Sequence, residues 1–194
     1  DGNLIVLGGP GSGKTTIALL KADREISDGN LRPGQQILFL SFARATIARV
    51  AQQADKLLGR KYGDRLETNT YHGFAWNLLR SHGYLLRAGR GIQLLPPPEA
   101  AARLADLDSD ARHSEKRRLF ADDGLLHFDL FAELSGTLLT KSKSLCKTFC
   151  DAYPIIILDE FQDTNKEEWE LIQALGKHSR LIALADADQR IYEF

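Results

Sequence analysis

The sequence predicts an open α/β sheet of parallel strands, with helices on both faces and one small helical insertion. Two observations support this fold class. Short, almost entirely apolar segments recur along the chain, which is typical of strands buried on both faces of a parallel sheet. Segments with helical periodicity lie between them, so strands and helices alternate. The four predicted strands are residues 4–7, 37–40, 155–158 and 181–184.

The helices follow the strands in order. They are predicted over residues 14–27, 43–58, 71–82 and 166–175. The middle of the chain differs, because three prolines at 96–98 interrupt it and a charged, Ala- and Arg-rich stretch follows. We therefore expect a sheet segment over 1–95, a small helical insertion over 96–127, and the rest of the sheet domain over 128–194.

Composition narrows the class of protein. Hydrophobic residues make up 43% and charged residues 26%, as in a soluble globular protein. No apolar run approaches the ~20 residues that span a bilayer, so no membrane contact is expected. The net charge of −1 disfavours a domain that coats duplex DNA by charge alone, so any nucleic-acid site must be local. The chain has no methionine, and we expect it to be a piece of a longer protein.

Two cysteines, Cys146 and Cys150, lie four residues apart. No second Cys or His pair stands at metal-ligand spacing, so a zinc site is not expected. We interpret them as thiols packed within a helix in the reducing cytoplasm.

The first strand leads into a phosphate-binding motif. Residues 8–15 read Gly-Gly-Pro-Gly-Ser-Gly-Lys-Thr and match G-x-x-x-x-G-K-S/T in full. The backbone N–H groups of such a loop surround phosphate oxygens, and the helix that follows points its positive end at them. Lys14 would reach the β- and γ-phosphates of ATP, and the Thr15 hydroxyl would help to hold Mg²⁺. The predicted nucleotide-binding residues of this P-loop are Gly9, Pro10, Gly11, Ser12, Gly13, Lys14, Thr15 and Thr16.

The alternative is a glycine-rich turn that binds nothing. The position of the loop between an apolar strand and a helix favours ATP binding instead.

The third apolar segment ends in Asp159 and Glu160. An acidic residue at the tip of a strand that neighbours the P-loop strand is placed to bind Mg²⁺, and a second carboxylate can orient the attacking water. Alone, such a pair is usually only solvated; with the P-loop, it predicts a metal site at Thr15 and Asp159 and a catalytic role for Glu160. Thr164 and Glu167 are expected to form a capping box for the next helix.

The motifs, taken together, resemble a known family. Residues 155–165, Ile-Ile-Ile-Leu-Asp-Glu-Phe-Gln-Asp-Thr-Asn, resemble motif II of the UvrD/Rep/PcrA-type DNA helicases of superfamily 1A. Residues 184–194 resemble motif III, 40–45 resemble motif Ia, and 70–74 resemble motif Ib. The resemblance covers almost the whole chain except the insertion. It implies the N-terminal RecA-like P-loop NTPase domain of such a helicase, which works with a second RecA-like domain of the same protein.

The resemblance also implies roles for single residues. Lys14 and Glu160 would be catalytic, and Asp159 would hold Mg²⁺. Gln189 would contact the γ-phosphate, act in catalysis and link the nucleotide to the DNA.

The implied path of single-stranded DNA contains Phe42, Arg44, His72, Tyr192 and Phe194. Stacking of a base on an aromatic ring is worth ~1–3 kcal/mol and needs no sequence preference, so a domain without net positive charge can use it. By residue type alone, Phe42 and Phe194 would be assigned to the core. The motif context favours DNA contact for both.

The sequence departs from the family pattern at a few positions. Ser41-Phe42-Ala43-Arg44 stands where the family commonly has Thr-Phe-Thr-Asn, and Ala185 stands where it has Gly. Several relatives carry an adenine-packing Arg at the position of Thr16, so phosphate binding is better supported than adenine recognition.

Three further features are interpreted as structural. Trp76 and Trp169 lie on predicted helices with apolar neighbours and are expected in the core. The basic run at 112–118 is expected to be a solvated helix face, with DNA contact as the alternative.

We therefore expect a motor domain that couples ATP hydrolysis to translocation on single-stranded DNA and duplex unwinding, nearly inactive as an isolated piece. Two alternatives stay open: a non-motor P-loop module in which ATP binding regulates DNA or partner binding, and a P-loop kinase. Glu160 and Gln189 argue against the module, which needs no water-activating carboxylate. The kinase leaves motif III unexplained.

Overall fold

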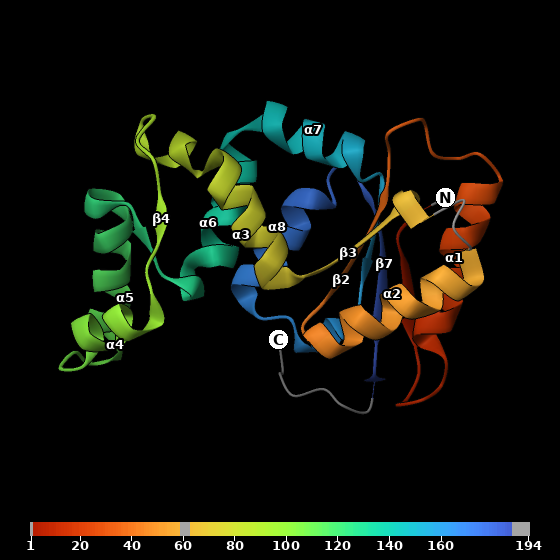
Figure 1. Ribbon diagram of the computed structural model, residues 1–194, viewed down its shortest axis with the longest axis horizontal. Coiled ribbons are helices and arrows are strands. Elements are labelled where there is room, and N and C mark those ends of the chain that lie inside the picture. Colours follow the sequence, from red (N-terminus) through yellow and green to blue (C-terminus); the bar gives the residue numbers. More distant parts are fainter. Residues whose placement is uncertain (1, 59–62, 188–194) are drawn as a thin grey trace.

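The computed structural model describes residues 2–58 and 63–187 and contains the predicted parallel α/β sheet (Figure 1). Its five strands run parallel in the order β1-β7-β6-β2-β3. The four predicted strands and four predicted helices all occur, with ends within one residue of the expected positions. The strands are β1 (Leu4–Leu7), β2 (Ile37–Ser41), β3 (Leu66–Thr70), β6 (Ile155–Leu158) and β7 (Arg180–Ala185).

Helices cover both faces of this sheet (Figure 1). Helices α1 (Lys14–Ser27) and α2 (Arg44–Leu58) lie on one face. The other face carries α3 (Tyr71–His82), α6 (Phe131–Lys141), α7 (Lys143–Ala152) and α8 (Lys166–Leu175). Short 3-10 turns η1 (Gly63–Arg65), η2 (Gly83–Arg87), η4 (Phe128–Leu130) and η5 (Phe161–Asp163) connect these elements. The molecule is therefore a three-layer α/β sandwich.

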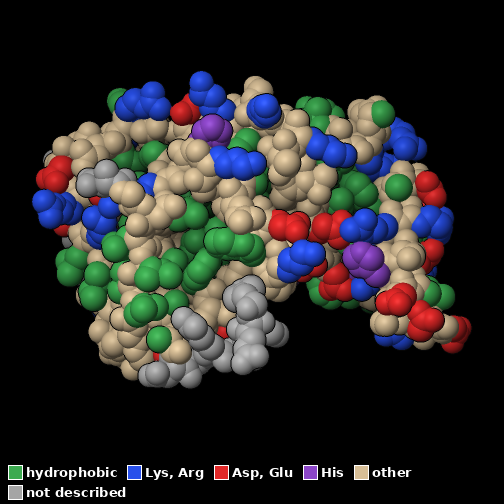
Figure 2. Space-filling view, turned by 180° about the vertical axis from the view of Figure 1, so that it is seen from behind, with side chains coloured by type: hydrophobic (Ala, Val, Ile, Leu, Met, Phe, Trp, Pro, Cys, Tyr) green, Lys and Arg blue, Asp and Glu red, His purple; other side chains and the backbone are tan. Residues whose placement is uncertain are grey.

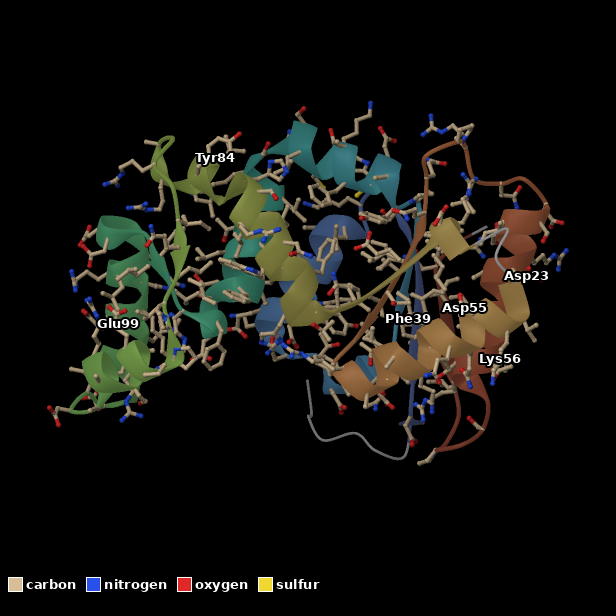
Figure 3. The ribbon with its side chains drawn as sticks, viewed as in Figure 1. Asp23, Phe39, Asp55, Lys56, Tyr84 and Glu99 are labelled. Atoms are coloured by element: carbon tan, nitrogen blue, oxygen red, sulfur yellow. The ribbon has the colours of Figure 1, made fainter. Side chains whose placement is uncertain are left out.

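The central strands are apolar throughout because each contributes to two cores. Successive side chains of a strand point to opposite faces. On β2, Ile37 and Phe39 pack with α1 and α2, whereas Leu38 and Leu40 pack with the helices of the other face. Figure 3 labels Phe39 on this strand, near α2. This double burial explains why the segments lack the alternation of a half-exposed strand.

Strand β3 was not predicted from the sequence. Its residues Leu-Glu-Thr-Asn-Thr are mostly polar, and only Leu66 is buried. It forms one edge of the sheet and pairs in register with β2, from Ile37 opposite Leu66 to Ser41 opposite Thr70. Backbone pairing with β2, which nearly every residue can make, therefore allows this polar segment to join the sheet.

The insertion is a small helical lobe beside the sheet (Figure 1). It contains α4 (Pro97–Leu104), α5 (Ser109–Arg118) and a π-helical turn, η3 (Leu119–Asp123). Strands β4 (Gln93–Leu94) and β5 (Leu125–Leu126) pair with each other on either side of it in the sequence. The lobe has a core of its own made by Leu95, Ala100 and Leu119.

The basic run of α5 is paired with acidic side chains. Lys116 contacts Asp129, and Arg117 contacts Glu133 at 2.7 Å on helix α6. Arg118 binds Glu115 of its own helix at 2.7 Å. These ion pairs fit the solvated, structural interpretation. The pairs of Lys116 and Arg117 also connect the lobe to the sheet domain, whereas the pair of Arg118 lies within α5.

The predicted packing of the two cysteines is confirmed. Cys146 and Cys150 are free and buried, and their Sγ atoms lie 3.3 Å from the carbonyl oxygens of Ala174 and Leu175. They pack α7 against α8. No cluster of potential metal ligands of the His, Cys, Asp and Glu type occurs in the part of the chain that the structure describes.

Two structural predictions were wrong. Trp76 packs on Phe131 against the core as expected, but Trp169 is 37% exposed and makes an edge contact with Phe161.

The second wrong prediction is the capping box of α8. It is formed by Asn165 and Glu168, not by Thr164 and Glu167. Helix α8 begins one residue later than a cap at Thr164 would require.

None of the described helices is both long and apolar enough to cross a membrane.

Candidate functional site

The predicted motifs meet at one edge of the sheet. The P-loop follows β1, Ser41 ends β2, Thr70 ends β3, and Asp159 and Asp186 follow β6 and β7. All five strands are parallel and in register, so their carboxyl ends lie along the same edge. This is where open α/β sheets bind their ligands.

The P-loop depends on glycine at two positions. Gly11 has a φ of 73° and Gly13 a φ of 85°, a region that L side chains rarely adopt. Gly13 is also the N-cap of α1, so its left-handed conformation turns the loop into the helix. The amide of Gly8 donates to the carbonyl of Ala185 at 3.2 Å, which joins the start of the loop to the end of β7.

Lys14 lies on the first turn of α1 and folds back over the loop. Its Nζ donates to the carbonyl of Gly8 at 2.5 Å and to that of Gly9 at 3.1 Å. Thr15 follows and is half-buried, whereas Thr16 is exposed. The helix N-terminus, the loop amides and the ammonium group together make a site for a phosphate chain.

Asp159 is held rigidly at the end of β6. It is 4% exposed, its Oδ2 accepts a hydrogen bond from Ser41 Oγ at 3.0 Å, and its amide donates to Leu40 at 2.8 Å. Burial raises the pKa of this carboxyl, an effect that the bond from Ser41 partly offsets. A divalent cation would favour its ionised form, and carboxylate and hydroxyl oxygens are donors that Mg²⁺ prefers. The donor chemistry of Asp159 and Thr15 therefore fits Mg²⁺.

Glu160 adopts an unusual backbone conformation. Its φ of 50° and ψ of 45° lie in the left-handed region, which is uncommon for a residue other than glycine and clusters at functional sites. Its Oε2 accepts a hydrogen bond from Gln162 Nε2 at 2.7 Å. Gln162 Oε1 in turn accepts from the amide of Asp186 at 3.0 Å.

Gln162 thus bridges the turn after β6 and the end of β7. The sequence analysis did not single it out. The available signal was its place in the motif II run, two residues after the catalytic candidate.

The order of the strands corrects one premise of the metal-site prediction. Strand β6 does not neighbour the P-loop strand, because β7 lies between β1 and β6. The carboxylate pair therefore follows the second strand from the P-loop strand, and the end of β7 separates the two motifs. Gly8 and Gln162 both bind the backbone at the end of β7, at Ala185 and Asp186 respectively.

Three predicted DNA-path residues lie in the described part of the chain. Phe42 is half-buried and stacks on Tyr71, with ring centroids 4.4 Å apart and an interplanar angle of 27°. Arg44, the first residue of α2, and His72, on the first turn of α3, are exposed. Phe42 thus packs against the core and also keeps part of its surface accessible. Gln189, Tyr192 and Phe194 lie outside the described residues.

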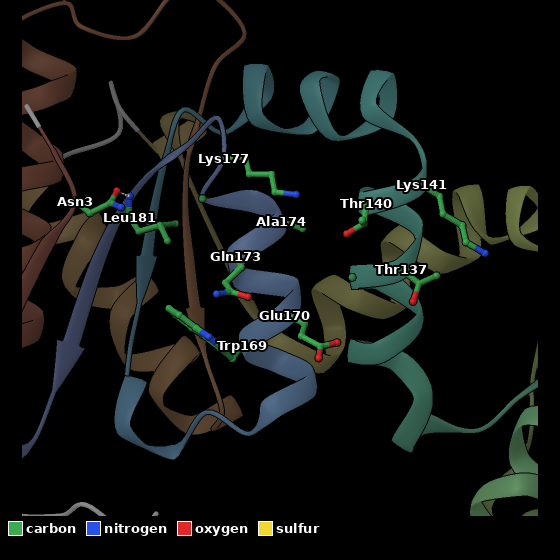
Figure 4. Close-up of a pocket in the computed structure, with 12 residues that line it drawn as sticks. Asn3, Thr137, Thr140, Lys141, Trp169, Glu170, Gln173, Ala174, Lys177 and Leu181 are labelled. Carbon is green, nitrogen blue, oxygen red and sulfur yellow. Dashed lines mark hydrogen bonds between the residues drawn. The ribbon is translucent and has the colours of Figure 1, made fainter. Parts of the chain in front are cut away.

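A groove lies away from the ends of the strands. It has a volume of about 750 Å³ and lies between α6, α8 and β7, lined among others by Trp169, Gln173 and Leu181 (Figure 4). None of the predicted site residues lines it. The candidate site is therefore defined by the strand ends and not by this groove.

Comparisons with known proteins identify the family of the chain. A family model described as "AAA domain" matches residues 1–194. The ATP-dependent DNA helicase Rep of Escherichia coli is 23% identical over 236 residues, which cover 100% of this chain and 35% of that protein. DNA helicase II of Escherichia coli is 24% identical over 233 residues, which cover 98% of this chain and 32% of that protein. The chain thus spans about a third of the length of these relatives.

The family match covers every strand and motif described above, including the P-loop after β1 and the carboxylates after β6. The similarity to Rep and DNA helicase II extends along almost the whole chain. The chain belongs to the AAA domain family, on a RecA-like P-loop NTPase fold.

Proposed function

We propose that this chain is the ATP-hydrolysing motor domain of a DNA helicase, coupling hydrolysis to movement along single-stranded DNA and to duplex unwinding. The observation that carries the proposal is the shared edge of the sheet. A P-loop, two motif II carboxylates and the partly exposed ring of Phe42 all follow parallel strands there. The names of Rep and DNA helicase II, both DNA helicases, support it. The chain spans about a third of the length of these relatives, so we propose the activity for the complete gene product.

The residues of the proposed nucleotide site have separate roles. The P-loop residues 9–16 bind the phosphates, with Lys14 neutralising the β- and γ-phosphates. Thr15 and Asp159 would hold Mg²⁺, which would supply further positive charge to the phosphates. Glu160 orients and deprotonates the attacking water. Gln162 supports this role, because its hydrogen bond fixes the carboxylate of Glu160.

The DNA path lies at the ends of β2 and β3. Phe42 offers a ring for base stacking, and Arg44 and His72 place polar side chains beside it. In this proposal, Gln189 contacts the γ-phosphate and links the nucleotide to the DNA. Tyr192 and Phe194 would extend the DNA path. A second RecA-like domain of the same protein would complete the ATP site. The cytoplasm remains the expected compartment, supported by the two free, buried thiols.

The non-motor P-loop module is the main alternative. A module that only binds ATP does not need a fixed carboxylate beside the phosphates. Glu160 has a left-handed backbone conformation, and its carboxylate accepts a hydrogen bond from Gln162. Glu160 and Gln162 therefore favour hydrolysis. No observation favours a kinase.

The test is ATP turnover by the complete gene product, with and without a deoxythymidine oligonucleotide, for wild type and Glu160→Gln. The oligonucleotide should raise wild-type turnover. The substitution should lower turnover by ~10²–10⁴-fold, the contribution of a general base, while ATP still binds. Glu170→Gln, an exposed carboxylate on α8, is the matched control. Turnover that ignores DNA would contradict the motor, and ATP binding without turnover in wild type would favour the module.

A further inference from the structure

The helical lobe is joined to the sheet domain by a neck, which we define as residues 87–94 and 119–126. The returning half of the neck contributes to two cores. Leu119 packs in the core of the lobe, whereas Phe120 and Leu126 pack in the core of the sheet domain. Figure 2 shows a hollow beside the lobe, which projects at the right of that view. The neck is therefore a packed junction that can set the orientation of the lobe.

Arg87 is buried inside this neck and is only 6% exposed. Its guanidinium donates to the carbonyl of Gly91 in the outgoing half. It also donates to the carbonyls of Asp122 at 3.1 Å and Ala121 at 3.4 Å, in the π-helical turn of the returning half. Its buried Nε has no hydrogen-bond partner among the described residues. One buried cation thus links both halves of the neck through backbone carbonyl oxygens.

The backbone around Arg87 is shaped to enclose the guanidinium. Ala88, the next residue, has a φ of 52° and a ψ of 41°, a left-handed conformation that is uncommon outside glycine. In the returning half, Gly124 has a φ of 75°, and a Cβ at this position would overlap the Arg87 guanidinium. Backbone strain of this kind persists where the surrounding structure holds it in place. Both positions therefore favour the arrangement of the neck in which Arg87 is enclosed.

The ion pairs between the lobe and the sheet domain are weaker constraints on its orientation. Lys116 pairs with Asp129, whose side chain is 43% exposed. Arg117, whose side chain is 57% exposed, pairs with Glu133. Ion pairs with exposed partners contribute little and weaken with salt, whereas hydrogen bonds of a buried charge are strong. Arg87 is therefore the stronger determinant of how the lobe is oriented.

Helix α3 connects Arg87 with the proposed DNA path. The helix carries His72 on its first turn and runs directly into η2, which ends at Arg87. The neck begins where this helical segment ends. A fixed neck therefore also fixes the lobe relative to the DNA path at His72.

We propose that Arg87 is a positioning residue that holds the lobe in one orientation, and that this orientation is needed to separate duplex DNA but not to hydrolyse ATP. The inference rests on the proposed function and assigns a part of it, unwinding, to the lobe and its neck. Movement along one strand can separate the other strand only if the duplex meets an element that does not turn away. The hydrogen bonds of Arg87 go to the neck alone and not to the proposed ATP site, so its loss should leave ATP turnover intact.

The experiment compares two rates of the complete gene product. One is ATP turnover with a deoxythymidine oligonucleotide, and the other is unwinding of duplexes that carry a single-stranded tail of either polarity. Arg87→Met keeps a long side chain and removes every donor. It should lower the unwinding rate by about tenfold or more, the scale of one hydrogen bond to a charged group, and change turnover by less than about twofold.

A second variant and a control accompany this substitution. Gly124→Ala keeps Arg87 but crowds its guanidinium, so it should also slow unwinding and spare turnover. It tests the proposal even if Arg87→Met does not fold. Arg103→Met is the matched control, because Arg103 is an exposed arginine of the lobe that binds Glu99 of its own helix. Its two rates should equal those of wild type.

Hydrogen exchange of the complete gene product separates positioning from folding. In Arg87→Met, the backbone amides of the neck should exchange faster than in wild type. The amides of α4, α5 and β6 should stay as protected as in wild type, because the lobe and the sheet domain each remain folded.

The outcomes distinguish the two proposals. Wild type that unwinds neither duplex overturns the proposed function and this inference with it. Wild-type unwinding that persists at the same rate in folded Arg87→Met and Gly124→Ala overturns the positioning role alone. A parallel loss of turnover and unwinding, or a loss of protection across α4 and α5, also overturns it, because Arg87 would then only stabilise the fold.

Discussion

Strands β1 and β6 have similar sequences, Leu-Ile-Val-Leu and Ile-Ile-Ile-Leu, but very different surroundings. All four residues of β6 are buried between β7 and β2. On β1, which pairs only with β7 among the described strands, Ile5 is 53% and Leu7 57% exposed. Helix α1 adds Ile17 and Leu20, about half exposed, and Figure 2 shows hydrophobic side chains gathered on one side of the molecule. An apolar strand sequence therefore indicates a strand but does not determine how deeply it is buried.

The loops after these two strands also differ. The P-loop after β1 is shaped by backbone conformation, since Gly11 and Gly13 both have positive φ. The turn after β6 also contains a residue with positive φ, Glu160, but here side chains contribute as well, since Ser41 and Gln162 bind Asp159 and Glu160. The proposed phosphate site therefore relies on backbone amides, whereas the proposed site for a metal and water relies on side chains.

The largest expected effect is on the free energy of unfolding, and it should differ between substitutions in β6 and in β1. Ile157→Ala removes a fully buried side chain of β6 and should cost ~2–5 kcal/mol in the free energy of unfolding. Ile5→Ala on β1 should cost less than ~1 kcal/mol, because about half of that residue is already exposed. Urea unfolding of the 194-residue chain measures both. Equal losses would show that β1 is covered in solution.

A smaller effect should distinguish the glycines of the P-loop. A Cβ at Gly13 would meet no atom within 4 Å, so Gly13→Ala should cost only the ~1–2 kcal/mol of a left-handed conformation. Gly9→Ala, at a position with equal space and no positive φ, should change stability by less than ~0.5 kcal/mol. Thermal unfolding of the two variants provides the comparison. A loss at Gly9 as large as at Gly13 would contradict the conformational explanation.

The smallest effect concerns Asp159 and depends on pH. Because burial raises the pKa of this carboxyl in the folded state above the ordinary value of 3.8, its ionisation destabilises the fold as pH rises through the folded pKa. Asp159→Asn should therefore raise the melting temperature at pH 7 in Mg²⁺-free buffer. The gain should shrink as the pH falls toward 3.8, where the wild-type carboxyl becomes protonated in both states.

Mg²⁺ provides the control for this prediction. It should stabilise the wild type and not Asp159→Asn, since the ion needs the carboxylate. A variant that melts below wild type at neutral pH without Mg²⁺ would show that the bond from Ser41 outweighs burial.

Part of the candidate site was predictable because its signals are local. The P-loop is one continuous run of residues, and Asp159 and Glu160 directly follow an apolar strand. The supporting residues were not predictable. Ser41 binds Asp159 across 118 positions of sequence, and Gln162 reaches the backbone of Asp186 across 24. Neither contact leaves a periodic pattern in the sequence.

By itself, the sequence determined four strands of the main sheet and four of the helices, and which of these segments carry the phosphate and carboxylate motifs. Apolar periodicity and motif spacing depend on neighbours within one turn or strand, so they can be read along the chain. Only the tertiary structure decided that β7 lies between β1 and β6, that polar β3 joins the sheet, and that Trp169 is exposed. Strands pair through backbone groups that nearly every residue shares, so strand order and burial depend on how distant segments pack.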